Sequence, residues 1–278
     1  MLDLTLSPDE VPLAFLDVET TGLAPHYGDR VCEVAILRCR GEEVLDSLQQ
    51  LVNPQRPMGA GAFAVHGITE EMLRDAPTFA QVAEDVLELI EGAVLVGHNT
   101  PFDLSFLAEE LGRLGLSLPP LIALDTLRLA RRVYRLGSYA LGPVAAALGV
   151  DVRGHAHRAM SDVLLTRAVF QRLTDDLWRQ GLRTLNDLLR AQGGMLEFAR
   201  APTGDIPPLL QEALRERSLL RLRYLAENGA ETDRLVRPIT VCDRGGTLAL
   251  VAHCYLRDAL RTFRLDRILE MDLVKRPG

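Results

Sequence analysis

Two acidic residues close an apolar run near the start of the chain. Residues 13–16 are typical of a buried strand, and Asp17 and Glu19 follow them two positions apart. Because side chains alternate along a strand, both carboxylates face the same side. Two adjacent negative charges resist ionising together, and a bound cation offsets that repulsion. The pair therefore predicts a metal site.

Two further acidic residues lie near the starts of predicted helices. Asp103 follows a short apolar strand pattern and Pro101, a helix-start signal, and Asp162 comes five residues after His157. Five helical residues turn through about 500°, which would leave His157 and Asp162 about 140° apart, so His157 is expected on the preceding loop. The four carboxylates balance two Mg²⁺ or Mn²⁺ ions. Such a pair activates water and stabilises the leaving oxygen in phosphodiester cleavage.

Each of these residues also has a simpler explanation. Asp17 and Glu19 alone would only cap a strand end, and Asp103 alone would only stabilise a helix dipole. The joint occurrence of the motifs favours the metal site over these explanations. Three neighbouring residues are interpreted structurally: Asp125 as a helix N-cap, His98 as a packed histidine at or next to the site, and His155 as a loop histidine.

Composition and charge limit the possible classes of protein. The 278 residues are enough for two domains, and the net charge of −7 excludes a globally basic nucleic-acid coat. Residues 209–278 carry a net charge of +3 and the rest −10. The four cysteines have neither zinc spacing nor a C-x-x-C pair, so buried free thiols are expected. With no signal peptide and no apolar run near the roughly 18 residues of a spanning helix, a cytoplasmic protein without membrane contact is expected.

The hydrophobic patterns predict two domains of different class. Three early strands, two of them joined at Gly41 as a hairpin, precede alternating strands and helices up to about residue 172, which indicates an α/β domain with a mixed sheet and flanking helices. Short alternating strands after a Pro/Gly-rich stretch indicate a small, mostly-β barrel. The expected division is 1–175 for the first domain, 176–208 for a helical linker and 209–278 for the second domain.

Three sequence motifs resemble those of the DEDD exonucleases. These motifs are FLDVETTGL, GHNTPFDLSFL and HRAMSD, and the last matches the subgroup with H-x-x-x-x-D, which includes the proofreading epsilon subunit of bacterial DNA polymerase III. The resemblance covers about residues 10–175. It implies a ribonuclease-H-like fold and removal of nucleotides in the 3′ to 5′ direction with two metal ions. By position it implies a general base, His157, and the metal ligands Asp17, Glu19, Asp103 and Asp162.

The same resemblance suggests where a substrate binds. The turn after the first motif would offer backbone donors and a wedge to the terminal nucleotide, and the segment VHGIT would lie beside it. The expected substrate contacts are Thr20, Thr21, Gly22, Leu23, His66 and Asn99. A basic helix face could hold a DNA backbone, although a solvated face explains it better. That face consists of Arg128, Arg131, Arg132 and Arg135.

The C-terminal part is similar to the WYL domain, a small Sm-like barrel found in bacterial regulators and nuclease-associated proteins. The similarity covers about residues 209–275, but the Trp-Tyr-Leu positions read Leu248-Ala249-Leu250, so the family's ligand pocket is not expected intact. Three arginines there would either bind phosphates or form ordinary surface pairs with Asp266 and Glu270. They are Arg261, Arg264 and Arg267.

These features favour a metal-dependent 3′ to 5′ exonuclease acting on DNA, most readily single-stranded, in repair, proofreading or oligonucleotide clearance. An RNA-directed 3′ exonuclease is the alternative within the class, because metal ligands contact phosphate and not the 2′-hydroxyl. A non-catalytic nucleic-acid-binding regulator is the alternative outside it. The C-terminal domain would assist nucleic-acid binding, bind a ligand or dock a protein partner.

Overall fold

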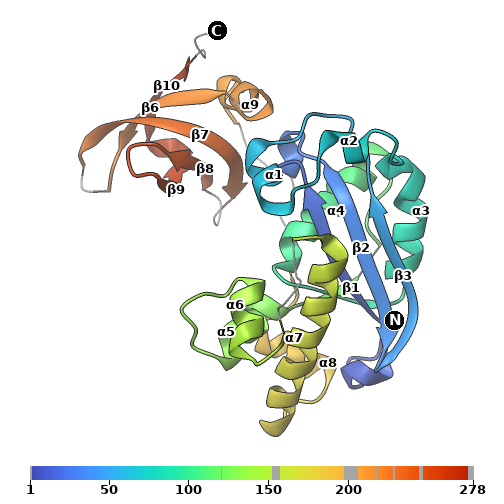
Figure 1. The fold of residues 1–278 in the computed structure, drawn as a ribbon. Coiled ribbons are helices and arrows are strands. Elements are labelled where there is room, and N and C mark those ends of the chain that lie inside the picture. Colours follow the sequence, from blue (N-terminus) through green and yellow to red (C-terminus); the bar gives the residue numbers. More distant parts are fainter. Residues whose placement is uncertain are drawn as a thin grey trace. The chain divides into compact units, whose positions relative to one another are not determined.

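The computed structural model describes residues 2–119, 121–151, 157–196, 206–216, 218–227, 229–243 and 247–274. The chain divides into two compact units (Figure 1). The first consists of Met1–Gly22 and Arg30–Phe198, and the second of Leu23–Asp29 and Ala199–Gly278.

A mixed sheet forms the centre of the first unit. Within the described residues its strand order is β3-β2-β1-β4-β5. The first three strands are antiparallel neighbours, whereas β1, β4 and β5 run parallel, which confirms the predicted mixed α/β fold. The strands are β1 (Leu13–Thr20), β2 (Val31–Arg40), β3 (Glu43–Leu51), β4 (Val94–Gly97) and β5 (Ile122–Asp125).

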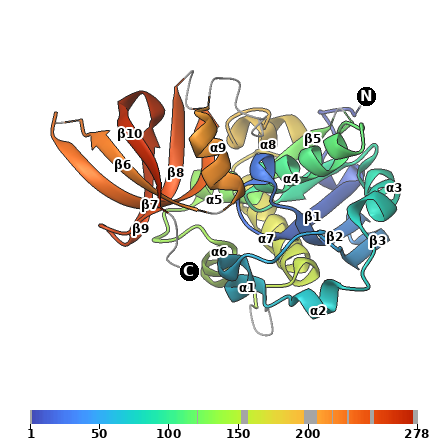
Figure 2. The ribbon, with the colours of Figure 1, turned by 90° about the horizontal axis from the view of Figure 1, so that it is seen from above.

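Helices cover both faces of this sheet (Figure 2). On one face, Leu16 and Val18 of β1 pack in a core with α3 and α4. On the other, Phe15 meets Phe170 of α7 edge-to-face, with ring centroids 5.7 Å apart, in a core that includes α5, α6 and α8. The helices are α1 (Ala60–His66), α2 (Glu70–Leu73), α3 (Phe79–Ile90), α4 (Thr100–Arg113), α5 (Thr126–Val133), α6 (Leu141–Ala147), α7 (Ala159–Arg179) and α8 (Leu185–Ala191), with the 3₁₀ turn η1 (Pro8–Glu10). A second 3₁₀ turn, η2 (Pro25–Tyr27), belongs to the second unit.

Much of the segment expected as a linker packs in the first unit. α7 continues to Arg179, and α8 contributes buried leucines to the same core as α7. Gln192 then accepts a hydrogen bond from the Asp125 N–H at 2.9 Å and donates one to the Ala123 carbonyl at 3.0 Å. Because β5 is an edge strand, this side chain satisfies backbone groups that a further strand would otherwise pair.

The second unit is mostly β, as predicted. In its described residues the strands form an antiparallel sheet in the order β10-β6-β7-β8-β9. Leu220 and Leu222 of β6 are buried and the intervening Arg221 is exposed, so the predicted alternation is confirmed. The elements are α9 (Pro208–Arg215), β6 (Leu219–Leu225), β7 (Glu231–Asp243), β8 (Leu248–Cys254), β9 (Ala259–Arg264), η3 (Leu265–Arg267) and β10 (Ile268–Val274).

Cys32, Cys39 and Cys254 are buried free thiols, as expected. Among the described helices, none combines the length and the apolar character needed to cross a membrane.

Candidate active site

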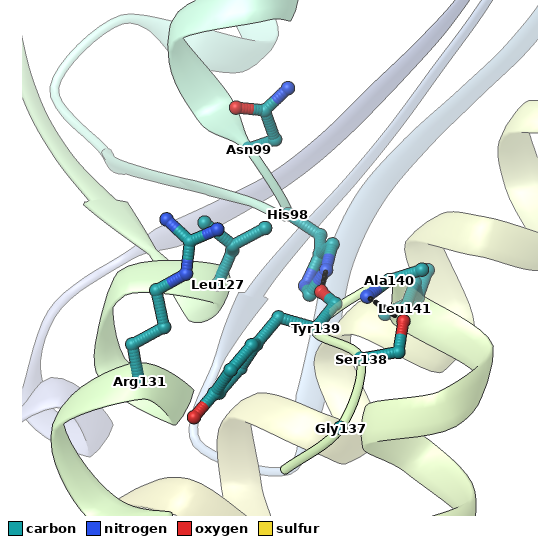
Figure 3. Close-up of a pocket in the computed structure, with 9 residues that line it drawn as sticks. All are labelled: His98, Asn99, Leu127, Arg131, Gly137, Ser138, Tyr139, Ala140 and Leu141. Carbon is teal, nitrogen blue, oxygen red and sulfur yellow. Dashed lines mark hydrogen bonds between the residues drawn. The ribbon is translucent and has the colours of Figure 1, made fainter. Parts of the chain in front are cut away.

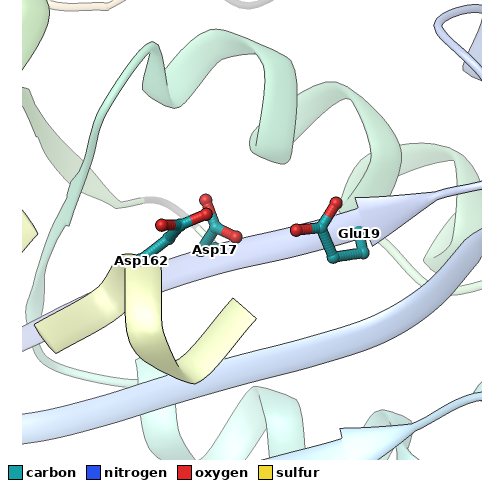
Figure 4. A group of neighbouring side chains, drawn as sticks. All are labelled: Asp17, Glu19 and Asp162. Atoms are coloured by element: carbon teal, nitrogen blue, oxygen red, sulfur yellow. The ribbon is translucent and has the colours of Figure 1, made fainter. Parts of the chain in front are cut away.

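The face of β1 that packs against α7 changes from apolar to acidic along the strand. Leu13 and Phe15 lie in the core on this face, and alternation places Asp17 and Glu19 on the same face at the end of the strand. Asp162, in the first turn of α7, completes a group in which one carboxylate oxygen from each of the three residues lies within 4.8 Å of the other two (Figure 4). Carboxylate oxygens are the donors that hard divalent cations prefer, so this group can hold one.

The electrostatics of the group fit a cation. Burial, followed by the charges of Asp103, Glu19 and Asp162, raises the pKa of Asp17 well above its usual value. Burial and the charge of Asp162 raise the pKa of Glu19 to about 8. Without a cation these carboxyls therefore keep protons near neutral pH, and a divalent cation would favour their ionised forms.

Asp103 lies beside this group without belonging to it. Its Oδ1 accepts a hydrogen bond from the N–H of Val18, the residue between Asp17 and Glu19, at 3.0 Å. The side chain is buried, and burial raises its pKa to about 8. The structure thus brings three of the four predicted metal ligands together and holds the fourth against the same strand.

His157 lies on the segment before α7, as its spacing from Asp162 predicted. It is exposed, and the helix begins two residues later at Ala159. An exposed histidine in an irregular segment can reorient, unlike the helix-bound Asp162. The competing His155 lies outside the described residues.

Glu33, which is buried, and Arg158, which is partly exposed, form an ion pair that the sequence did not predict. Glu33 is opposite Glu19 in the β1–β2 register and has no exposed surface. Arg158 donates from Nη2 to its Oε1 at 2.7 Å and from Nε to its Oε2 at 3.0 Å, and the Ala159 N–H donates to Oε2 at 3.1 Å. Burial opposes ionisation, but these donors hold the pKa of Glu33 below its usual value. A charged residue within the apolar run at residues 31–37 of β2 was the available signal.

A second missed pair ties α4 to the start of β2. Glu110 is buried and accepts two hydrogen bonds from Arg30, each of 2.7 Å, and one of 3.1 Å from the Val31 N–H. The pair fixes the helix that carries Asp103.

Two residues near the site have the structural roles expected of them. Asp125 is the N-cap of α5, since its Oδ1 accepts hydrogen bonds from the Leu127 N–H at 3.0 Å and the Asn99 N–H at 2.9 Å. His98 contacts the Thr126 hydroxyl through Nδ1 at 2.8 Å and donates from Nε2 to the Tyr139 carbonyl at 2.9 Å. Its burial lowers its pKa, which favours the neutral ring.

The turn predicted to meet the substrate is held by its own hydroxyls. Thr20 donates to the Gly22 carbonyl at 2.6 Å, and the Thr21 hydroxyl accepts from the Arg30 N–H at 3.1 Å. Both threonines are buried, whereas the side chain of Leu23 is 55% exposed. This exposure is compatible with the predicted wedge.

His66 and Asn99, the other predicted contacts, differ in their surroundings. Both ring nitrogens of His66 have backbone partners, because Nδ1 accepts from the Ile68 N–H at 3.0 Å and Nε2 donates to the Thr20 carbonyl at 3.3 Å. In the structure this histidine supports the end of β1. Asn99 is exposed at the N-terminus of α4, with a left-handed φ of 69°.

The three C-terminal arginines also differ from one another. Arg264 pairs with Asp266 through bonds of 3.0 and 2.6 Å, and Arg267 lies 3.7 Å from Glu227 rather than beside Glu270. Within the described residues Arg261 is exposed and has no ion pair.

The fold and the site together define a ribonuclease-H-like domain with a carboxylate group at the end of its central strand. The family model described as Exonuclease matches residues 14–170, more than half of the chain. The chain belongs to this exonuclease family. The model of the WYL domain matches residues 205–273.

Individual proteins resemble the exonuclease part. DNA polymerase III subunit epsilon of Rickettsia felis is 36% identical over 57% of this chain and 72% of its own length. DNA polymerase III PolC-type of Caldanaerobacter subterraneus is 34% identical over 62% of this chain, which spans only 12% of that protein. The solved structure of Exonuclease X in complex with 5′ overhanging duplex DNA is 27% identical, with a TM-score of 0.51 over 65% of this chain and 99% of that one.

Proposed function

We propose that the protein is a 3′ to 5′ exonuclease that removes nucleotides from DNA ends. The close approach of the Asp17, Glu19 and Asp162 carboxylates, on a chain of the exonuclease family, carries this proposal. Asp103, held against β1, is the fourth proposed ligand. Two divalent ions, Mg²⁺ or Mn²⁺, would supply Lewis-acid stabilisation of the phosphate and an activated water.

The protein's own residues position the substrate and move the proton. His157, exposed before α7, is the proposed general base and takes a proton from the attacking water. The Thr20–Gly22 turn is proposed to contact the terminal nucleotide, with Leu23 against its base. The pair of Glu33 and Arg158 fixes the backbone next to His157.

Single-stranded DNA is the proposed substrate, and an RNA 3′ end is the second candidate. A duplex with a 5′ overhang is also worth testing, because Exonuclease X is recorded with such a DNA. For the C-terminal domain we propose assistance in nucleic-acid binding through Arg261, or docking of a protein partner or small ligand. Placement in repair, proofreading or oligonucleotide clearance is part of the same proposal.

The test is digestion of 5′-labelled single-stranded DNA, overhanging duplex and RNA with Mg²⁺, Mn²⁺ or EDTA. Shortening of the labelled strand in single-nucleotide steps, only with metal, is the expected result. Asp17→Asn should abolish it, whereas Asp85→Asn, an exposed carboxylate on α3, should leave it intact. Cleavage by the Asp17 variant at the wild-type rate would refute the assignment, and metal-dependent shortening of RNA alone would select the second candidate.

A further inference from the structure

An open pocket of about 610 Å³ lies beside the first turn of α4. Asn99 at the N-cap of this helix lines it, and Asp103 lies four residues further on, about 6 Å along the helix axis. Arg131 of α5 and the loop residues Ser138 and Tyr139 form other walls (Figure 3). About one helical turn therefore separates the Asn99 wall of the pocket from Asp103, and none of the four proposed metal ligands lines the pocket.

Arg131 supplies an unpaired positive charge to this pocket. Its guanidinium carbon lies 5.4 Å from the centroid of the Tyr139 ring, a cation–π contact that orients it. No carboxylate among the described residues pairs with it, whereas Arg128, one turn earlier, lies 3.8 Å from Asp125. An arginine held by a ring rather than by an acid keeps its N–H donors available for an anion.

The walls of the pocket are fixed by hydrogen bonds. The Tyr139 hydroxyl donates to the Tyr134 carbonyl at 3.0 Å and accepts from the Leu136 N–H at 3.2 Å. The backbone carbonyl of Tyr139 accepts a hydrogen bond from His98 Nε2. The Asn99 N–H is bound by Asp125, while its side-chain amide has no partner within the described part of the chain. A guanidinium and a free amide thus line a preformed site, which is the chemistry of phosphate recognition.

We propose that this pocket binds an internal phosphodiester of the substrate strand, on the 5′ side of the bond that is cleaved, with Arg131 as its main ligand. The proposal rests on the proposed function, because the scissile phosphate belongs at the carboxylates. A mononucleotide ester contains only that phosphate, so Arg131 should contribute only to strands with a further linkage. Arg132 follows it on α5 without lining the pocket and provides a matched control.

The first experiment locates the phosphate by binding in EDTA, where no cleavage occurs. Single-stranded 12-mers, each with one uncharged methylphosphonate linkage, are titrated with the full-length protein and followed by fluorescence anisotropy. One linkage near the 3′ end should weaken binding about tenfold, as expected for a lost charged hydrogen bond. Arg131→Ala should also weaken the binding of unmodified DNA about tenfold. The affinity of this variant should not fall further when that linkage is uncharged. Arg132→Ala should bind every 12-mer as the wild-type protein does. Equal affinity of the wild-type protein for all the modified 12-mers would overturn the proposal. The same dependence of affinity on linkage position in the Arg131 variant would also overturn it.

The second experiment separates this inference from the proposed function. Hydrolysis of thymidine 5′-(p-nitrophenyl phosphate) with Mn²⁺ should require the carboxylates, His157 and the terminal-nucleotide site, but no further phosphate site. Arg131→Ala should lower kcat/KM on a 12-mer about tenfold more than on this ester. Equal losses on both substrates would overturn the subsite. A wild-type protein that hydrolyses neither substrate would overturn the proposed function, while a position-specific loss in EDTA would still support the phosphate site.

Discussion

Arg158 holds Glu33 with three hydrogen bonds, one of 2.7 Å from Nη2 and two from Nε of 3.0 and 3.2 Å, directly beside the segment that carries His157. The carboxylate is completely buried, and 35% of the arginine side chain is exposed. The pair connects β2 to the N-terminus of α7, because the same carboxylate also accepts the Ala159 N–H. It therefore sets the position of His157 and of Asp162 relative to β1.

This asymmetry in burial predicts unequal effects of removing either partner. Arg158→Ala leaves a buried charge without its partner and should lower the free energy of unfolding by about 3 kcal/mol. Glu33→Gln leaves a partly solvated arginine and should cost about 1 kcal/mol. Urea unfolding measures both. Arg179→Ala, which removes an exposed pair with Asp176 on the same helix, should cost under about 1 kcal/mol. Equal costs at Arg158 and Arg179 would contradict a structural role for the pair.

His157→Ala should lower turnover by about 10²- to 10⁴-fold, because the water loses its proton acceptor. Since His157 is not a proposed metal ligand, Mn²⁺ affinity should stay within about twofold of wild type. His155→Ala is the control and should change turnover much less. Steady-state kinetics and calorimetric Mn²⁺ titration give the two readings, and equal losses of turnover at both histidines would show that the wrong one was assigned.

Without metal, the protein should lose stability as the pH rises toward about 8. Burial raises the pKa of Glu19 from 4.5 to about 8 and that of Asp103 from 3.8 to about 8, so the folded state binds these protons more tightly than the unfolded chain. The stabilisation is fully present below the unfolded pKa values and is lost as the pH rises through the folded ones. Melting temperatures in EDTA between pH 5.5 and 8.5 should fall, and excess Mg²⁺ should reduce the decline. A rise over that interval in EDTA would refute the expectation.

Asp17→Asn should abolish cleavage and raise the melting temperature of the metal-free protein at pH 8. The substitution removes one of several mutually repelling carboxylates, since burial and the charges of its neighbours raise the pKa of Asp17. Thermal unfolding in EDTA compares the two proteins. A lower melting temperature for the variant would count against the repulsion, although not against the metal site.

Arg261→Ala should reduce the salt dependence of single-strand binding by about 0.7 in the log–log slope, the value for one phosphate contact. Arg264→Ala should change it less, because Asp266 already neutralises that guanidinium. Point substitutions test the domain more cleanly than deletion of residues 209–278, since Leu23–Asp29 groups with the second unit. Unchanged slopes in both variants would favour a protein partner or a small ligand for this domain.

Local patterns in the sequence were sufficient for the mixed sheet and for most of the site. Alternation placed Asp17 and Glu19 on one face, the spacing of His157 and Asp162 placed the histidine before the helix, and Asp125 followed from N-cap preferences. These features depend on residues within a few positions of each other, where backbone geometry alone decides the outcome.

Features that depend on distant segments were not predictable. Glu33 pairs with a residue 125 positions away, and Gln192 completes the edge of β5 across 67 positions. No periodicity marks such partners, because a buried polar side chain is specified by what the fold brings beside it. For the same reason residues 176–208 were expected to be a helical linker, although α8, which lies within them, packs in the first core.

Because successive side chains of β1 point to opposite faces of the sheet, metal affinity also depends on the register of β1 against β2. A slip of one residue against β2 would turn Asp17 and Glu19 into the core of α3 and α4 and bring Leu16 and Val18 under α7. Such a misaligned chain would keep its sheet and its helices but would lack the carboxylate group. Recovery of Mn²⁺ affinity during refolding therefore reports when β1 has paired with β2 in its native register. A measurement of secondary-structure content alone would miss this event.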